Sequence, residues 1–243
     1  SAAIFGFLML GLFILTFAFY PQNAALPRYD FVFLTALAIQ IGLIAFKWET
    51  WDEAKVILIF HIVGTVMEIF KTYAGSWAYP EANFFRIAGV PLFSGFMYAS
   101  VGSYIARSWR IYDFRFTNYP NFWWTVALAV AVYVNFFSHH FGPDMRTVLF
   151  VVTIGLFWRS RVHITLPNGA NLTAWLMLLF LFVGGLIYTA ENIATFGRAW
   201  IYPGQADGWR MVPLAKYGSW LLLMLLSWVL VSALRRDDLN QRS

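Results

Sequence analysis

The chain contains no cysteine, which excludes disulfides, thiolate metal sites and cysteine nucleophiles. Charged residues are also scarce. They make up 12% of the 243 residues, where a soluble domain has about 25%. The sequence has no phosphate-binding loop, dinucleotide fingerprint, nucleophile elbow or Ser/His/Asp arrangement. These absences argue against an enzyme that uses a nucleotide, and we expect no cofactor.

Two further ligand classes lack support in the sequence. The net charge of +5 is ordinary for a membrane protein with basic cytoplasmic loops, so it does not indicate nucleic-acid binding. His139 and His140 precede Asp144, but adjacent side chains point to different faces of a helix. No His-x-x-His or Glu-x-x-His spacing accompanies them. We therefore predict no metal site.

Apolar sequence is abundant. Hydrophobic residues make up 60% of the chain, aromatic residues 20%, and the mean hydropathy is +0.62. A soluble fold of this size could not hide that much apolar surface, so we predict that the lipid bilayer is its solvent. Tryptophan and tyrosine are typical of the membrane interface. The chain also has 25 phenylalanines, which is more than the membrane interface requires, and this excess suggests that some of them line an apolar cavity.

Apolar runs between proline, glycine and charged breaks predict about eight transmembrane helices, because about 20 residues span the hydrocarbon. The predicted fold class is all-α, a polytopic bundle that forms a single transmembrane domain over residues 1–243. The predicted helices cover residues 3–20, 29–46, 54–74, 91–112, 121–140, 144–163, 171–196 and 212–235.

Loop charges predict the orientation. Ten basic residues fall on one side of the predicted helices and five on the other, and the positive-inside rule makes the richer side cytoplasmic. We expect a multi-pass protein of a bacterial cytoplasmic (inner) membrane, with its C-terminus in the cytoplasm. The chain begins at Ser1 inside apolar sequence, without a charged leader, which leaves open that residues precede it. The ten are Lys47, Lys55, Arg107, Arg110, Arg115, Arg159, Arg161, Arg235, Arg236 and Arg242, and the five are Arg28, Arg86, Arg146, Arg198 and Arg210.

Two segments of the chain match each other. Glu68 is followed by Trp77-Ala78-Tyr79-Pro80, and Glu191 is followed at the same spacing by Trp200-Ile201-Tyr202-Pro203. Each copy then reaches Val-Pro-Leu, at 90–92 and 212–214. Copies four helices apart keep the same direction, which predicts a parallel repeat of four plus four helices about the membrane normal. The repeats would cover about residues 1–112 and 121–236.

The two matching acids are the centre of the predicted site. An acidic residue inside a bilayer is a candidate functional residue by default, because burying its charge costs several kcal/mol. One interpretation is an ion-pair network that holds the repeats together, and the other is a site with tuned acids. The candidate catalytic residues are Glu68, Glu191, Lys71, Lys216 and His61, although a hydrogen-bonded core histidine is the alternative for His61. The candidate substrate-binding residues are Trp77, Tyr79, Ser94, Tyr98, Asn192, Thr195, Trp200 and Tyr202.

These motifs resemble a known family over nearly the whole chain. Gly75-Ser76-Trp77-Ala78-Tyr79-Pro80, Gly89-Val90-Pro91-Leu92, Ala190-Glu191-Asn192 and Lys216-Tyr217-Gly218-Ser219-Trp220 resemble the bacterial membrane family catalogued as domain of unknown function 817. An acid late in a helix, followed by Gly, an aromatic pair and Gly-Val-Pro-Leu, is more distantly similar to small lycopene cyclases and carotenoid hydratases. That resemblance implies that Glu68 and Glu191 protonate a polyene end group. The cyclases have a paired acid after the next proline, where this chain has Leu92-Phe93-Ser94 and Leu214-Ala215-Lys216.

Three functional hypotheses follow from the sequence. The first is an enzyme that transfers protons to a lipophilic substrate, polyprenyl or carotenoid-like, with a buried glutamic acid as general acid. The second is a proton-coupled transporter or carrier, because intramembrane acids often relay protons. The third is a non-catalytic subunit or binding protein of a membrane complex. The sequence fixes neither the substrate nor the oligomeric state.

Overall fold

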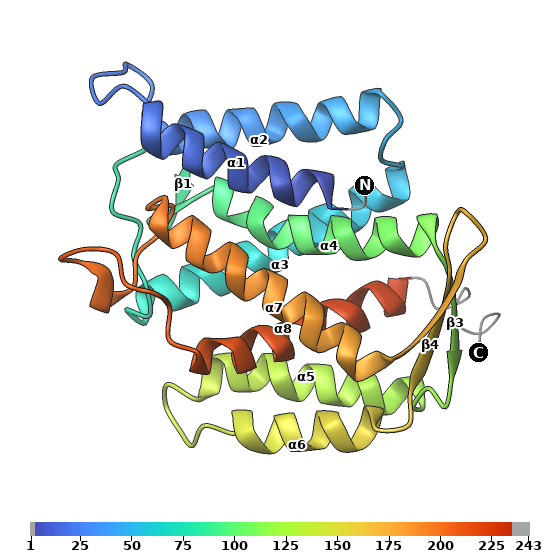
Figure 1. Ribbon diagram of the computed structural model, residues 1–243. Coiled ribbons are helices and arrows are strands. Elements are labelled where there is room, and N and C mark those ends of the chain that lie inside the picture. The colour runs from blue at the N-terminus through green and yellow to red at the C-terminus, as the bar shows by residue number, and fades with distance from the viewer. Residues whose placement is uncertain (1–2, 235–243) are drawn as a thin grey trace. The chain divides into compact units, whose positions relative to one another are not determined.

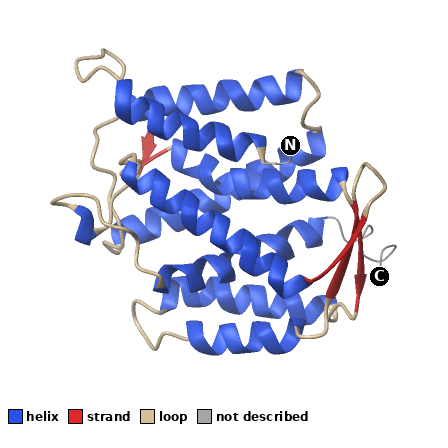
Figure 2. Ribbon diagram, in the orientation of Figure 1, coloured by secondary structure: helices blue, strands red, loops and turns tan. Residues whose placement is uncertain are grey.

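The computed structural model describes residues 3–234, which form eight α-helices, five short strands and one 3-10 turn (Figures 1 and 2). The helices are α1 (Ile4–Phe19), α2 (Arg28–Ala45), α3 (Trp51–Tyr73), α4 (Phe93–Ile111), α5 (Phe122–Ser138), α6 (Arg146–Phe157), α7 (Leu176–Phe196) and α8 (Ala215–Leu234). The strands are β1 (Arg86–Ile87), β2 (Val90–Pro91), β3 (Asp113–Thr117), β4 (Arg161–Thr165) and β5 (Asn171–Trp175), and the 3-10 turn η1 is Pro203–Gln205.

The strands correct the prediction of an all-α chain. The sixth helix, predicted over 144–163, begins at Arg146 and ends at Phe157, and β4 follows it. The seventh, predicted from residue 171, begins at Leu176, because 171–175 form β5. Polar and apolar residues alternate in both strands, and Asn168-Gly169 forms the turn between them, with Gly169 at φ 83°. Asn-Gly between alternating segments is a strong hairpin signal, and the apolar content of the region concealed it.

The other predicted helices differ from the observed ones by three residues or fewer at each end that falls within the described residues. The fourth begins at Phe93 instead of residue 91, because Val90–Pro91 pairs with Arg86–Ile87. The eighth begins at Ala215 instead of residue 212. Its predicted end and the predicted cytoplasmic C-terminus lie outside the described residues, as do the loop charges Arg235, Arg236 and Arg242.

The chain divides into two compact units. The first comprises the residues up to Arg107 together with Ala190–Val212, and the second comprises Ser108–Thr189 together with the residues from Pro213. Each unit therefore contains segments that are distant in sequence. The division differs from the predicted repeats, which stay a prediction.

The first unit is built around α3 and α4. These helices approach closely at three glycines, since a Cβ on Gly64, Gly95 or Gly102 would lie within 2.7 Å of a side chain of the other helix. Aromatic rings fill the adjoining core, where Phe93 contacts Phe13 with ring centroids 5.6 Å apart and Tyr29 with centroids 5.0 Å apart. α1 packs beside α2 (Figure 1).

The second unit combines helices α5, α6 and α8, which pack against one another, with an antiparallel sheet of order β3-β4-β5. Phe116 on β3 contacts Trp109 and Trp228, with ring centroids 5.8 and 5.7 Å apart. These rings form the core beneath the apolar face of the sheet.

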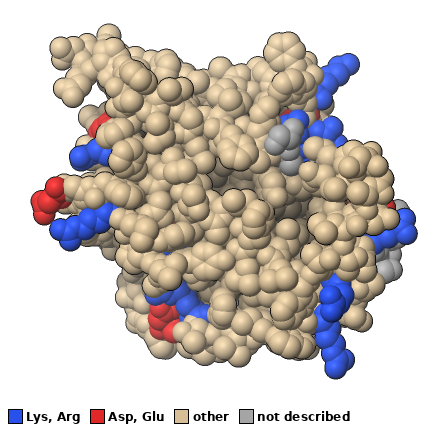
Figure 3. Space-filling model, viewed as in Figure 1, with Lys and Arg blue, Asp and Glu red and all other residues tan. Residues whose placement is uncertain are grey.

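Three helices are long and apolar enough to cross a membrane: α2, α7 and residues Ala215–Ala233 of α8. Shorter apolar helices are α1, α5 and α6. Charged side chains are sparse on the face of the molecule in Figure 3, where most of the surface belongs to other residues. These features indicate a membrane protein.

Candidate functional site

The carboxylate of Glu68 is the best-defined polar site of the first unit. Glu68 lies five residues before the end of α3 and is 3% exposed. Its Oε2 accepts hydrogen bonds from Trp77 Nε1 at 2.7 Å and from the Tyr79 hydroxyl at 2.6 Å. Its Oε1 accepts one from the Tyr98 hydroxyl on α4 at 2.7 Å. Three neutral donors from two segments therefore surround one buried acid.

Glu191 on α7 is placed in a corresponding way. It is 2% exposed, and its Oε1 accepts a hydrogen bond from the Tyr202 hydroxyl. In both copies of the motif the tyrosine that binds the acid stands eleven residues after it. The matching Tyr-Pro sequences therefore have a common role. In each, the tyrosine hydroxyl donates a hydrogen bond to the glutamate of the preceding helix.

The two matching loops lie side by side. Ala78 and Ile201 form an antiparallel bridge with two N–H···O bonds of 2.9 Å. The rings of Trp77 and Tyr202 meet edge to face, with centroids 6.0 Å apart. The structure thus brings the two copies of the Trp-x-Tyr-Pro motif together.

The loop tyrosines are held as hydrogen-bond donors. Burial and the nearby Glu68 carboxylate raise the pKa of Tyr79 well above its usual value. Burial and Glu191 raise the pKa of Tyr202 in the same way. Both phenols therefore keep their protons at physiological pH.

Gly64 determines where the third donor lies. The Tyr98 ring packs directly on Gly64 of α3, and a Cβ there would lie 2.5 Å from Cγ and Cδ2 of that ring. Any larger residue must push Tyr98 away from Glu68. Gly64 is therefore a positioning residue for this hydrogen bond.

We expect Gly64→Ala to lower the free energy of unfolding by about 1–3 kcal/mol, the usual cost of overpacking. The measurement is unfolding of the purified protein in detergent, followed by tryptophan fluorescence. The control is Gly42→Ala on α2, where a Cβ meets nothing within 4 Å, so the gain in helix propensity leaves stability unchanged or raises it by up to about 1 kcal/mol. Equal stability of the two variants would contradict the tight contact at Gly64.

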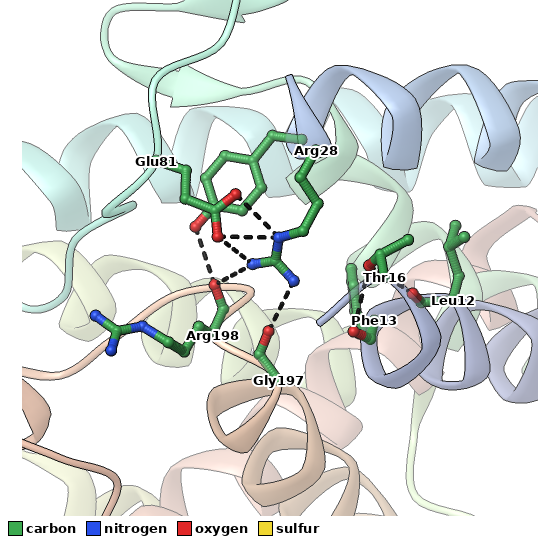
Figure 4. A network of polar contacts seen from close by, with 8 residues as sticks. Leu12, Phe13, Thr16, Arg28, Glu81, Gly197 and Arg198 are labelled. Atoms are coloured by element: carbon green, nitrogen blue, oxygen red, sulfur yellow. Dashed lines mark hydrogen bonds and ion pairs between the residues drawn. The ribbon is translucent and has the colours of Figure 1, made fainter. Parts of the chain in front are cut away.

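The start of α2 fastens the two loops to the unit (Figure 4). Arg28 donates from Nε and Nη2 to the carboxylate of Glu81, two residues after Tyr79, at 2.6–2.9 Å. Its Nη1 donates to the Gly197 carbonyl and its Nη2 to the Arg198 carbonyl, both at 2.9 Å. One buried guanidinium therefore joins the first loop to the chain that leads into the second.

Asp30 organises the remainder of the first loop. It is fully buried, and its carboxylate accepts hydrogen bonds from the backbone N–H of Phe84 and Phe85 at 2.7 and 2.8 Å. Sequence reasoning missed Arg28 and Asp30 as site residues and counted Arg28 only as a loop charge. Both belong to the first turn of α2, after Pro27, and this proline signals the start of the helix but not the burial of the two side chains.

The remaining predicted site residues of the first unit have separate surroundings. Lys71 is buried one turn after Glu68. The His61 ring packs on Gly95 and on Phe96, with ring centroids 4.8 Å apart. Among the described residues, no hydrogen-bond partner is found for His61 Nδ1 or Ser94 Oγ.

On the second copy, Asn192 and Thr195 organise the loop that follows α7. Asn192 Oδ1 accepts from the Val212 N–H at 2.9 Å, and Thr195 Oγ1 accepts from Trp209 Nε1 at 3.2 Å. Trp200 is buried in the same unit. Lys216 belongs to the first turn of α8 in the second unit, so its predicted pairing with the acids stays a prediction.

A second buried polar cluster, which the sequence did not reveal, lies at the opposite end of α3. Glu49 is 3% exposed and accepts hydrogen bonds from Gln40 Nε2 on α2 and from Ser103 Oγ on α4. Glu53 is fully buried and forms a capping box with Thr50. The Thr-x-x-Glu spacing is a readable signal for the helix start, but it does not indicate burial. Among residues 3–234, no group of three or more His, Cys, Asp or Glu could hold a metal ion.

Comparisons with known proteins agree with the motifs. The model of the family described as "Protein of unknown function (DUF817)" matches residues 1–228. The chain is similar to "Uncharacterized protein YoaT" of Bacillus subtilis (strain 168), with 45% identity over 211 residues, which are 87% of this chain and 80% of that protein. No solved structure matches the chain. The likeness to lycopene cyclases and carotenoid hydratases stays a prediction from the motifs.

Proposed function

We propose that this chain, which belongs to the family described as "Protein of unknown function (DUF817)", is an integral membrane protein that transfers protons at its buried glutamates. In this proposal all eight helices cross the bilayer. The three candidate spans and three shorter apolar helices support it. α6 is the shortest crossing, since its 12 residues cover about 18 Å and require local thinning of the bilayer.

The ends of α3 support a crossing despite its charges. Trp51 at its start and Tyr73 at its end are 75% and 90% exposed. They lie about 33 Å apart along a straight helix, which matches a hydrocarbon core of about 30 Å with an aromatic residue at each interface. Of the charged residues between these ends, Glu53, Glu68 and Lys71 are buried. Asp52 and Lys55 are exposed, but both belong to the first two turns of the helix, near the interface, and they form an ion pair with each other.

Exposed tryptophans support a membrane interface at the ends of the proposed crossings. Six tryptophans of the described residues are exposed, and Trp209 is the one that falls on the proposed outer side. The other five are Trp48, Trp51, Trp123, Trp124 and Trp158. In the proposed alternation of helices these five fall on the same side as the basic loops, which the positive-inside rule makes the cytoplasmic side of an inner membrane. Exposed indole rings near helix ends are typical of a membrane interface. Glu68 and Glu191 then lie toward the outer side, and the equivalent Glu–Tyr contacts are consistent with a parallel repeat.

The observation that carries the functional proposal is the surroundings of the Glu68 carboxylate. A general acid becomes a carboxylate as it gives up its proton, and this charge is costly in a buried site. At Glu68 the donors from Trp77, Tyr79 and Tyr98 are already in place to stabilise that carboxylate. Such preorganised donors favour proton transfer because they do not need to reorient during the reaction.

The neighbours of these donors favour a lipophilic substrate. Tyr79 contacts the rings of Phe93 and Tyr29, with centroids 5.9 and 6.2 Å apart. Aromatic faces in an apolar setting accommodate a hydrocarbon chain and stabilise a cationic intermediate. We therefore propose a polyprenyl or carotenoid-like substrate, protonated by Glu68 or its counterpart Glu191.

The test begins with mass spectrometry of lipids that copurify with the protein, followed by a turnover assay on the lipid so identified. We expect Glu68→Gln to lower kcat by about 10²–10⁴-fold, the usual contribution of a general acid. Asp52→Asn is the control, because Asp52 is exposed at the other end of α3. Unchanged turnover by Glu68→Gln would remove Glu68 from this role.

Proton-coupled transport is a second candidate, and the acids at both ends of α3 favour it. Glu53 and Glu68 are buried about 22 Å apart along the helix, with His61 between them. Transport predicts proton flux into proteoliposomes that Glu53→Gln and Glu68→Gln both abolish, without chemical change in any lipid. A non-catalytic subunit, the third alternative, predicts neither turnover nor flux.

A further inference from the structure

Gln40, Glu49 and Ser103 form a polar cluster at the end of the first unit opposite Glu68. Gln40 Nε2 donates to Glu49 Oε2, and Ser103 Oγ donates to Glu49 Oε1 at 2.6 Å. Both oxygens of the Glu49 carboxylate therefore already accept a hydrogen bond. Arg107 stands one turn after Ser103 on α4, so the two side chains lie on the same face of that helix.

Two side chains of this region have unsatisfied polar atoms. Among the described residues, no partner is found for Nε and Nη1 of Arg107 or for Oε1 of Gln40. Arg107 is 8% exposed and Gln40 7%. A buried guanidinium without an acceptor is costly, and so is a buried carbonyl without a donor. The contact with Glu49 fixes which end of the Gln40 amide carries the nitrogen, so an amide flip does not remove the unsatisfied oxygen.

The unsatisfied atoms define the chemistry of a missing ligand. The guanidinium of Arg107 requires acceptor oxygens and matches the geometry of a phosphate. Gln40 Oε1 requires a hydroxyl or amine that donates to it. We propose that Arg107 and Gln40 bind a phosphate group that carries a hydroxyl, with a phosphate oxygen on the guanidinium and the hydroxyl on the amide oxygen.

Neighbouring charges favour a ligand with one negative charge. Glu49 and Glu53 are buried in the same region, and their carboxylates oppose a dianion. A phosphodiester carries a single charge, and the headgroup of phosphatidylglycerol combines it with free hydroxyls. Inorganic phosphate offers the same groups at a higher charge.

The depth of the site also favours a lipid headgroup. Gln40 lies five residues before the end of α2, and Arg107 lies four residues before the end of α4. These separations correspond to about 6–8 Å along a helix, so the site lies within two turns of these helix ends, where a lipid headgroup of that leaflet can reach it. The ligand therefore enters from the leaflet at this end of the unit.

The decisive measurement is the phospholipid retained by the purified full-length protein, quantified by phosphorus analysis and mass spectrometry. We expect wild type to retain phosphatidylglycerol and Arg107→Gln to bind it at least tenfold more weakly. Arg110→Gln is the matched control, because Arg110 is an exposed cation on the same turn of α4. Equal retention by Arg107→Gln and wild type would overturn the proposal.

A second measurement needs no variant and identifies the source of the phosphate. The melting temperature of wild type is recorded in nanodiscs of phosphatidylcholine, in nanodiscs that contain phosphatidylglycerol, and in phosphatidylcholine nanodiscs with inorganic phosphate. An increase with phosphatidylglycerol alone identifies the lipid, and an increase with inorganic phosphate identifies the free ion. No increase in either condition, together with no retained phosphorus, contradicts the site. Glu68→Gln should retain the same phospholipid and show the same increase in melting temperature as wild type, so the test is independent of the proposed proton transfer.

Discussion

Replacing Arg28 by glutamine is expected to lower the free energy of unfolding by about 3 kcal/mol. This value is at the lower end of the range for breaking a buried ion pair, because Glu81 is 35% exposed while Arg28 is 8% exposed. The variant leaves Glu81 without its cation and removes donors from the carbonyls of Gly197 and Arg198. Unfolding in mixed detergent micelles, followed by tryptophan fluorescence, measures the change.

Lys55→Gln provides the matched control for Arg28→Gln. Lys55 and Asp52 form an ion pair of 3.0 Å with side chains 75% and 80% exposed, and exposed pairs contribute about 0–1 kcal/mol. Arg28→Gln should also weaken the Glu68 site, because the loop that carries Trp77 and Tyr79 loses its anchor. If both variants unfold like wild type, Arg28 does not fasten the loops.

Replacing Glu68 by leucine is expected to lower the free energy of unfolding by about 3 kcal/mol or more. The change leaves Trp77 Nε1 and the hydroxyls of Tyr79 and Tyr98 without their acceptor. A buried donor left unsatisfied costs about 1–3 kcal/mol, and the three contributions are not independent. The same unfolding measurement applies.

Glu68→Gln separates the acid from the hydrogen-bond acceptor. The amide keeps one oxygen for these donors but brings an NH₂ group that donates, so we expect a smaller loss than for leucine. A stable Glu68→Gln variant that has lost turnover would indicate proton transfer. A Glu68→Leu variant as stable as wild type would show that the three hydrogen bonds contribute nothing to the fold.

The sequence predicted the helices well wherever apolar runs met strong breaks. α1 to α5 agree with it to within three residues, because proline, glycine and charged residues end helices locally. It failed at β4 and β5, where the apolar content of 161–175 hid a two-residue alternation. Periodicity cannot separate a short apolar strand from part of a buried helix.

The site was predictable only in part. Equal spacing in two matching segments placed Glu68, Glu191, Tyr79 and Tyr202 among the candidate site residues, but it did not predict that each tyrosine donates to the acid before it. Tyr98, which stands 30 residues after Glu68, entered the prediction as a candidate substrate-binding residue and not as a hydrogen-bond donor to that acid. Its contact depends on the close approach of α3 and α4 at Gly64, which no local pattern encodes.

By itself the sequence determined the class of this protein, most of its helices and the two acids followed by Trp-x-Tyr-Pro. Composition and local breaks carry that information, because lipid selects apolar helices of limited length. The tertiary structure alone decided which donors surround each acid, that Arg28 reaches a carbonyl 169 residues away, and that Arg107 and Gln40 remain unsatisfied. Such contacts depend on which helix faces meet, and that is a property of packing rather than of spacing along the chain.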